Sequence, residues 1–132
     1  VYFGSFDSRG FELWRSDGTR DGTRLEADLA PGPQSSVPSH LVASGDSLFL
    51  LTAPYVEGEP TVDGQLWHVR DQIATNLKPS GGAHAPVAAG GLVFFLATES
   101  ACGFFCGGSG LWRSDGTPEG TYALSIAGGT AY

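Results

Sequence analysis

Hydrophobic positions fall in short runs that are rich in β-branched and aromatic side chains and are separated by Gly, Pro, Asp and Ser. Such runs are typical of β-strands, whereas no stretch keeps an apolar stripe at the 3.6-residue period of a helix. The pattern therefore predicts an all-β protein. The expected strands are 1–5, 11–16, 23–29, 40–44, 47–53, 65–70, 72–77, 85–89, 91–98, 110–114 and 121–126.

One segment of the chain occurs three times. ELWRSDGTRDGT, which begins at Glu12, returns as GLWRSDGTPEGT from Gly110, and a degenerate copy, QLWHVRDQIAT, begins at Gln65. The copies centre on Trp14, Trp67 and Trp112, which lie 53 and 45 residues apart. A period in the forties that contains strands and no helix indicates the four-stranded antiparallel blade of a β-propeller-like fold.

The repeat arithmetic predicts a single repeat domain, residues 1–132, of about three blades. Blade 1, residues 1–30, lacks its first strand; blade 2 is expected at 40–78 and blade 3 at 85–127. Three blades do not close a ring, because known propellers have at least four. The chain contains no Met and opens directly in a strand. We therefore expect it to be a piece of a longer chain or part of a larger complex.

The DGT-x-x-GT element predicts the outer hairpin of each blade. Asp17-Gly18 and Asp21-Gly22 are expected to make two successive tight bends, with both glycines at positive φ and the Asp and Thr side chains bonded to nearby backbone. Asp115-Gly116 holds the place of Asp17-Gly18 in the third copy, whereas Asp71-Gln72 predicts a shorter turn in the middle copy.

The Leu-Trp pairs predict how the blades stack. Side chains alternate between the two faces of a strand. Leu13, Leu66 and Leu111 are therefore expected on one face of their blades and the tryptophans on the other. Stacking of blades is expected to bury both faces.

Composition and charge exclude several function classes. Hydrophobic residues make up 41% of the chain and charged residues 16%, with 20 Gly and 8 Pro, which fits a turn-dense, soluble all-β protein. No segment is long enough to cross a membrane as a helix. With 7 basic and 14 acidic side chains the net charge is −7, so nucleic acid is not an expected partner.

Cys102 and Cys106 bracket Gly103-Phe104-Phe105 in a Gly-rich segment. This spacing is not that of a redox or zinc C-x-x-C pair, and no second Cys pair exists to complete a metal shell. A local disulfide is predicted, which implies an oxidising compartment. The alternative is a pair of free, buried thiols.

The two complete motifs resemble the bacterial ELWxxDGTxxGT repeat family. The linker 28–39, DLAPGPQSSVPS, is similar to that family's D-I-x-P-G-x-x-S-S-x-P-x segment. The resemblance implies propeller-like blades in large secreted or cell-surface bacterial proteins, and hence an extracytoplasmic location: periplasmic, secreted or cell surface. It implies no catalytic residues. The middle copy departs from the family pattern where Asp71-Gln72 replaces the DGT-x-x-G hairpin.

The longest insertions are predicted to form the contact face. They lie at about 54–64 and 99–109, between the second and third strands of blades 2 and 3, on the side that also carries the blade-to-blade connections. The binding hypothesis includes Tyr55, Glu57, Glu59, Phe104 and Phe105, with a partner protein or surface glycan as ligand. The alternatives are that the phenylalanines cap the blade ends and that the acidic groups only solubilise the surface.

No catalytic motif occurs in the sequence. His40 and His84 lie near the entry to the first strand of successive blades, where a paired metal or acid–base role competes with ordinary polar linker positions; His68 follows Trp67. Asp17, Thr19, Asp21, Gly22 and Asp28 imitate the spacing of an EF-hand calcium loop, but strands flank them and Ile126 holds the equivalent of Asp28. No catalytic residue, metal or cofactor is predicted.

These observations predict a non-catalytic extracytoplasmic binding or scaffold module, such as an accessory subunit of a larger envelope or surface assembly. The alternative is the non-catalytic or substrate-binding part of a secreted hydrolase that acts on glycans or peptides. The enzyme alternative needs inward-facing carboxylates or histidines that recur at the same position at the end of each blade's first strand, and none recur.

Overall fold

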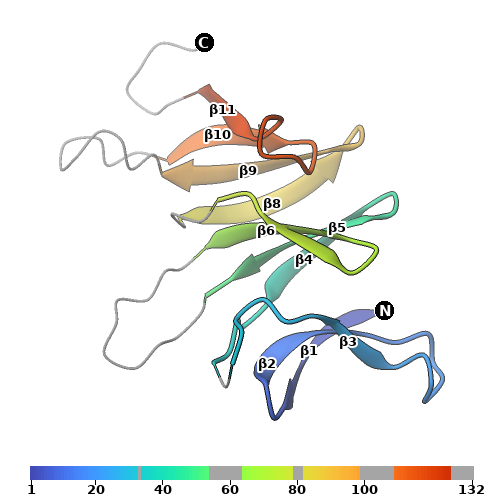
Figure 1. Cartoon of the computed structure of the whole chain (residues 1–132). Helices are drawn as coiled ribbons and strands as arrows, with labels where there is room; N and C mark the ends of the chain where they lie inside the picture. Colours follow the sequence, from blue (N-terminus) through green and yellow to red (C-terminus); the bar gives the residue numbers. More distant parts are fainter. Residues whose placement is uncertain (33, 54–63, 79–81, 99–108, 126–132) are drawn as a thin grey trace.

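A computed structural model describes residues 1–32, 34–53, 64–78, 82–98 and 109–125, and its strands form three antiparallel sheets (Figure 1). The first sheet contains β1 (Tyr2–Asp7), β2 (Gly10–Arg15) and β3 (Arg24–Ala27). The middle sheet contains β4 (Ser39–Ser44), β5 (Ser47–Thr52), β6 (Gln65–Arg70) and β7 (Ile73–Asn76). The third sheet contains β8 (Ala83–Ala89), β9 (Leu92–Thr98), β10 (Ser109–Ser114) and β11 (Tyr122–Ser125).

The prediction of an all-β protein is confirmed. Every expected strand is present, each within two residues of its predicted ends, and the described residues contain no helix. Each sheet is a meander in which consecutive strands are hydrogen-bonded neighbours. Short apolar runs separated by turn residues produce this topology, because a tight turn returns the chain antiparallel to the strand just completed.

The three sheets share one register around their tryptophans. Trp14 lies opposite Phe3, Trp67 opposite Leu50 and Trp112 opposite Phe95. By this register β1, β5 and β9 are equivalent strands, and β4 and β8 are their neighbours in the two larger sheets. The first sheet has no strand in that position among the described residues.

The outer hairpins match the predicted bends only in part. Gly18 and Gly116 have φ values of 93° and 97°, as expected, but Gly22 does not have positive φ. A Cβ atom at Gly22 would lie 2.0 Å from Oδ1 of Asp17. The second glycine is therefore required by the close approach of the Asp17 carboxylate, and the prediction of positive φ at this position is wrong.

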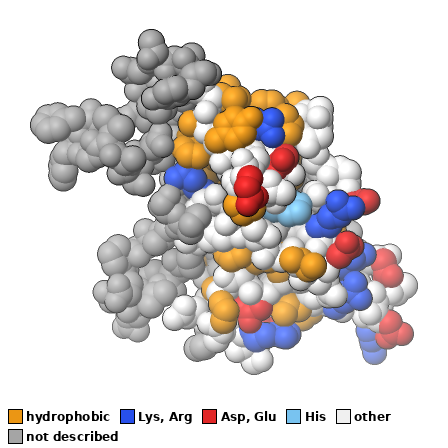
Figure 2. Space-filling view, turned by 45° about the horizontal axis from the view of Figure 1, so that its top comes forward, with side chains coloured by type: hydrophobic (Ala, Val, Ile, Leu, Met, Phe, Trp, Pro, Cys, Tyr) orange, Lys and Arg blue, Asp and Glu red, His pale blue; other side chains and the backbone are white. Residues whose placement is uncertain are grey.

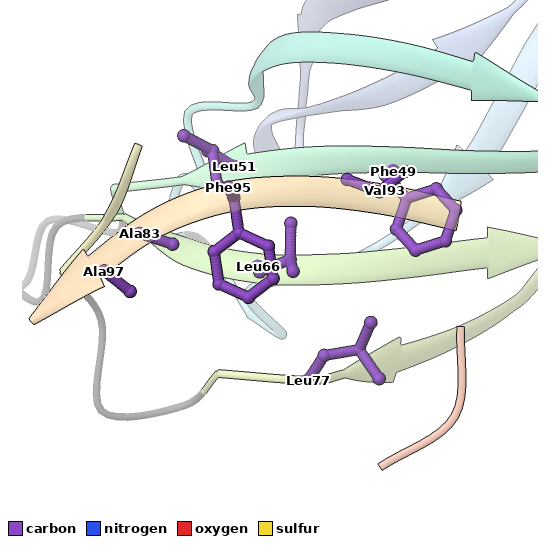
Figure 3. Packing of buried hydrophobic residues seen from close by; sticks show 8 residues of the cluster. All are labelled: Phe49, Leu51, Leu66, Leu77, Ala83, Val93, Phe95 and Ala97. Carbon is purple, nitrogen blue, oxygen red and sulfur yellow. The ribbon is translucent and has the colours of Figure 1, made fainter. Parts of the chain in front are cut away.

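The core lies between the sheets in two clusters. Leu13, Ala27, Leu29, Leu48, Leu50 and Val69 fill the space between the first and middle sheets. Phe49, Leu51, Leu66, Leu77, Ala83, Val93, Phe95 and Ala97 fill the space between the middle and third sheets (Figure 3). The middle sheet therefore buries both of its faces, whereas the outer sheets each place one face in the core.

Candidate interaction surface

The loop residues of the binding hypothesis lie outside the described part of the chain. They are Tyr55, Glu57, Glu59, Phe104 and Phe105, together with the predicted disulfide pair Cys102 and Cys106. Their hypotheses stay predictions. The described residues do form the faces of the outer sheets and a hollow between the first two sheets.

Each internal interface joins a leucine of one sheet to the tryptophan of the next. Leu13 and Trp67 share the cluster between the first and middle sheets. Leu66 and Trp112 share the cluster between the middle and third sheets, where the indole also stacks on Phe95 at 6.0 Å. Each interface thus contains a leucine of one sheet and the tryptophan of the next in the same cluster, and both leucines, Leu13 and Leu66, are completely buried.

The third sheet exposes the face that carries the next leucine in this series. Leu111 is 39% exposed, although the equivalent Leu13 and Leu66 are 0% exposed. Strand register places Leu96 beside Leu111, and Val87 and Tyr122 lie in the neighbouring row. These side chains are 38%, 60% and 45% exposed, respectively. The expectation that stacking buries both faces of every sheet is therefore wrong for this one.

We call this surface, made by Val87, Leu96, Leu111 and Tyr122, the end face. In Figure 2 hydrophobic side chains gather at the top of the view, over the end of the molecule formed by the third sheet. Arg113 lies among them, with its guanidinium carbon 4.9 Å from the centre of the Tyr122 ring. Its Nε is buried without a hydrogen-bond partner in the described structure. The end face thus combines apolar area with an unsatisfied donor.

At the opposite end of the stack, the first sheet has a face that carries its tryptophan. Because Leu13 faces the middle sheet, strand alternation turns the half-buried Trp14 to the other face of the first sheet. Trp14 Nε1 is buried and has no hydrogen-bond partner among the described residues. In the middle sheet the equivalent Trp67 Nε1 donates to Thr52 Oγ1 over 2.9 Å. The first sheet therefore presents a tryptophan face that lacks the leucine of a preceding sheet.

A hollow of about 380 Å³ opens between the first and middle sheets. Arg15 and Arg70 line it together with Glu26 and Asp71, so both signs of charge are present. Glu26 is 5% exposed, and its Oε2 has no hydrogen bond among the described residues, while Arg15 Nε lies 4.0 Å away. The mixed and loosely paired charges do not favour a ligand of one sign.

The three histidines do not converge on a common site in the described structure. His40 and His84 are exposed, and their Nδ1 atoms contact Ser39 Oγ and the Gly82 carbonyl oxygen, respectively. His68 is half-buried, and its Nε2 lies 2.9 Å from Ser47 Oγ. Burial is the main cause that lowers the pKa of His68, and the nearby Arg70 adds to the effect.

The aspartates of the repeated turn are used by the turn itself. Oδ1 of Asp17 accepts hydrogen bonds from the backbone N–H of Thr19 over 2.9 Å and from its hydroxyl over 2.6 Å. These bonds hold the pKa of Asp17 below its usual value, and the bonds from Thr117 do the same for Asp115. Within the described ranges, no group of three or more His, Cys, Asp or Glu side chains could hold a metal ion.

Glu12 is a buried carboxylate that the sequence pattern does not single out. Glu12 is 0% exposed and accepts hydrogen bonds from Leu29 N, Ser36 N and Ser36 Oγ over 2.8, 3.0 and 2.6 Å. Burial raises the pKa of Glu12, and these hydrogen bonds oppose that shift. Both carboxylate oxygens bind the linker that leads to the middle sheet, so Glu12 has a structural role: it holds this linker against the first sheet.

Comparison of the chain with family models, curated proteins and solved structures finds no match. The resemblance to the ELWxxDGT repeats therefore stays a prediction from the sequence motifs. Among the described residues, no helix is long and apolar enough to span a bilayer.

Proposed function

We propose that this chain is a non-catalytic binding and scaffold module that joins further β-sheets of its own type through its end face, in a propeller-like stack. The observation that carries the proposal is the contrast in exposure between equivalent leucines. Leu13 and Leu66 are each covered by the next sheet, whereas Leu111 is 39% exposed beside Leu96. Exposed apolar side chains that lie together on one face of a sheet indicate an interaction site.

The proposed partner is a sheet with a tryptophan face, supplied by a second copy of the chain. Both internal interfaces pair a leucine face with a tryptophan face, and the two ends of the stack leave one face of each kind. Copies would therefore associate head to tail, with the end face of one against the Trp14 face of the other. Such a heterologous contact produces rings or open filaments.

Measurement of molar mass against protein concentration tests this proposal. The unmodified chain is expected to associate, and Leu96→Glu to remain monomeric because it places a charge in the centre of the end face. Ile73→Glu is the matched control, since Ile73 is 68% exposed on the β6–β7 hairpin, away from the end face. A chain that stays monomeric at the highest soluble concentration, or equal effects of the two variants, would contradict the proposal.

The proposal includes the extracytoplasmic location and the ELWxxDGT resemblance, both of which rest on the sequence motifs. Expression with an export signal, followed by thiol titration of the purified chain, tests the predicted disulfide on which the location partly rests. A chain without titratable thiols would support a Cys102–Cys106 disulfide, whereas two reactive thiols would oppose it and remove that support for the location.

A further inference from the structure

We propose that the free edge of β1 accepts an extended peptide strand of the β4 type, which would complete the first sheet. β1 pairs only with β2 among the described residues, whereas its equivalents β5 and β9 each pair on both sides. An unpaired edge presents a row of backbone N–H and C=O groups that a further strand can bind. This binding mode uses a different surface from the end face.

The burial of β1 and of its equivalent β5 differs in the way expected if the place beside β1 lacks a strand. In β5 the five residues from Leu48 to Thr52 are buried, whereas β1 contains no buried residue. Tyr2 is 36% exposed, although its equivalent Phe49 is 1% exposed. The difference follows from the strand that covers β5 and has no counterpart beside β1.

The chain itself contains two templates for the missing strand. β4 and β8 occupy this position in the other sheets, and the offset of 45 residues aligns Val42-Ala43 of β4 with Val87-Ala88 of β8. Both strands also contain a left-handed residue at the same place, His40 with φ 51° and Ala85 with φ 53°. The ligand is therefore an extended segment with one left-handed residue, and Val-Ala begins two residues after it.

The templates also fix the register. Val42 lies opposite Phe49, and Val87 lies opposite Phe94. When the three sheets are aligned on their tryptophans, Tyr2 is equivalent to Phe49 and Phe94. The valine of the added strand would therefore lie opposite Tyr2. One face of that strand would then extend the cluster between the first and middle sheets. Val42 makes the equivalent contribution in the middle sheet, where it packs against the cluster between the middle and third sheets.

The test uses a synthetic peptide with the sequence of residues 38–45, PSHLVASG, added to the ¹⁵N-labelled chain. Two further peptides carry N-methyl groups at alternate positions, one at the equivalents of Leu41 and Ala43 and the other at those of Val42 and Ser44. In a strand, alternate N–H groups point to opposite edges. Only one of these peptides would therefore lose donors to β1.

We expect the unmodified peptide to shift the amide resonances of Tyr2–Asp7. One methylated peptide should bind at least about tenfold more weakly, and the other should bind as the parent does. Shifts confined to β4 and β5 would show that the peptide displaces β4 from the middle sheet and does not bind β1, which would overturn the proposal. Equal effects of the two methylated peptides, or no shift at millimolar peptide, would overturn it as well.

Discussion

The side chains of the repeated turn show how one motif combines several local constraints. Asp17 fixes Thr19, the Thr19 hydroxyl accepts a hydrogen bond from Gly22 N over 2.9 Å, and Thr23 Oγ1 donates to the Thr19 carbonyl over 2.6 Å. The same bonds recur from Asp115 to Thr121. The motif therefore repeats because Asp17, Thr19 and Thr23 each have a partner within the turn, and no ligand is needed to account for these three residues.

His68 is the residue whose protonation should change stability near neutral pH. Its ring lies 5.1 Å from that of Phe49, and a Cβ at Gly116 would lie 2.9 Å from the imidazole, so the third sheet encloses it. Because folding lowers its pKa, the unfolded chain binds more protons as the pH falls through the ordinary value of about 6.5. The free energy of unfolding should therefore fall with acidification in that window.

Urea unfolding at about pH 7.5 and about pH 5.5 measures this change. His68→Gln should remove the part of the pH dependence that belongs to this residue, whereas His84→Gln, at an exposed position, should leave it unchanged. If the two variants keep the same pH dependence as the unmodified chain, burial of His68 does not control its protonation.

At the scale of elements, the turn between β6 and β7 carries backbone strain. Asp71 and Gln72 connect the paired residues Arg70 and Ile73, and their φ values are 50° and 65°. A two-residue hairpin with positive φ at both positions favours Asn-Gly, because side chains with a Cβ are disfavoured in that region. The shorter turn predicted for the middle copy is confirmed, but its residues are poorly suited to it.

Gln72→Gly should therefore stabilise the fold by about 0.5–1 kcal/mol, since release of the strain exceeds the entropy cost of glycine. Gln72→Ala is the matched control and should give no such gain, because alanine retains the Cβ. Urea unfolding of both variants measures the difference. Equal stability of the two variants would show that the positive φ at this position costs nothing.

The sequence pattern predicts the strands better than the irregular positions between them. Short apolar runs bounded by turn residues place every strand, because burial of a sheet in the stack requires apolar side chains between its turns. The left-handed residues His40 and Ala85 carry no comparable signal, since positive φ is uncommon for every residue other than glycine. Glu12 was missed for a related reason: its partners Leu29 and Ser36 come from the linker, which has no periodic pattern.

At the scale of the whole molecule, the Leu-Trp pairs predict that sheets stack but not which face is left open. Alternation assigns each side chain to a face, and the presence of another sheet then decides its burial. Leu111 shows this limit, because its motif is nearly identical to that of Leu13 and yet its exposure is 39% against 0%. The candidate loops were chosen by their length and by the side of the blades on which they lie, and neither carries information about side-chain contacts.

The stability cost of Leu→Ala at the three equivalent leucines shows how the position of a sheet in the stack affects burial. Leu66 and Leu13 are each covered by a neighbouring sheet, so Leu→Ala should remove buried contacts and leave a cavity that costs about 2–5 kcal/mol at either position. At Leu111 the same change should cost less than about 1.5 kcal/mol in the monomer, because the side chain is already partly in water.

Urea unfolding of the three variants at low protein concentration gives the order of these costs. Repetition at high concentration then separates packing from association. If copies stack on the end face, association stabilises the folded chain, and Leu111→Ala should lose much of that added stability whereas Leu13→Ala and Leu66→Ala should keep it. A cost at Leu111 equal to that at Leu66 in dilute solution would show that the end face is covered within a single chain.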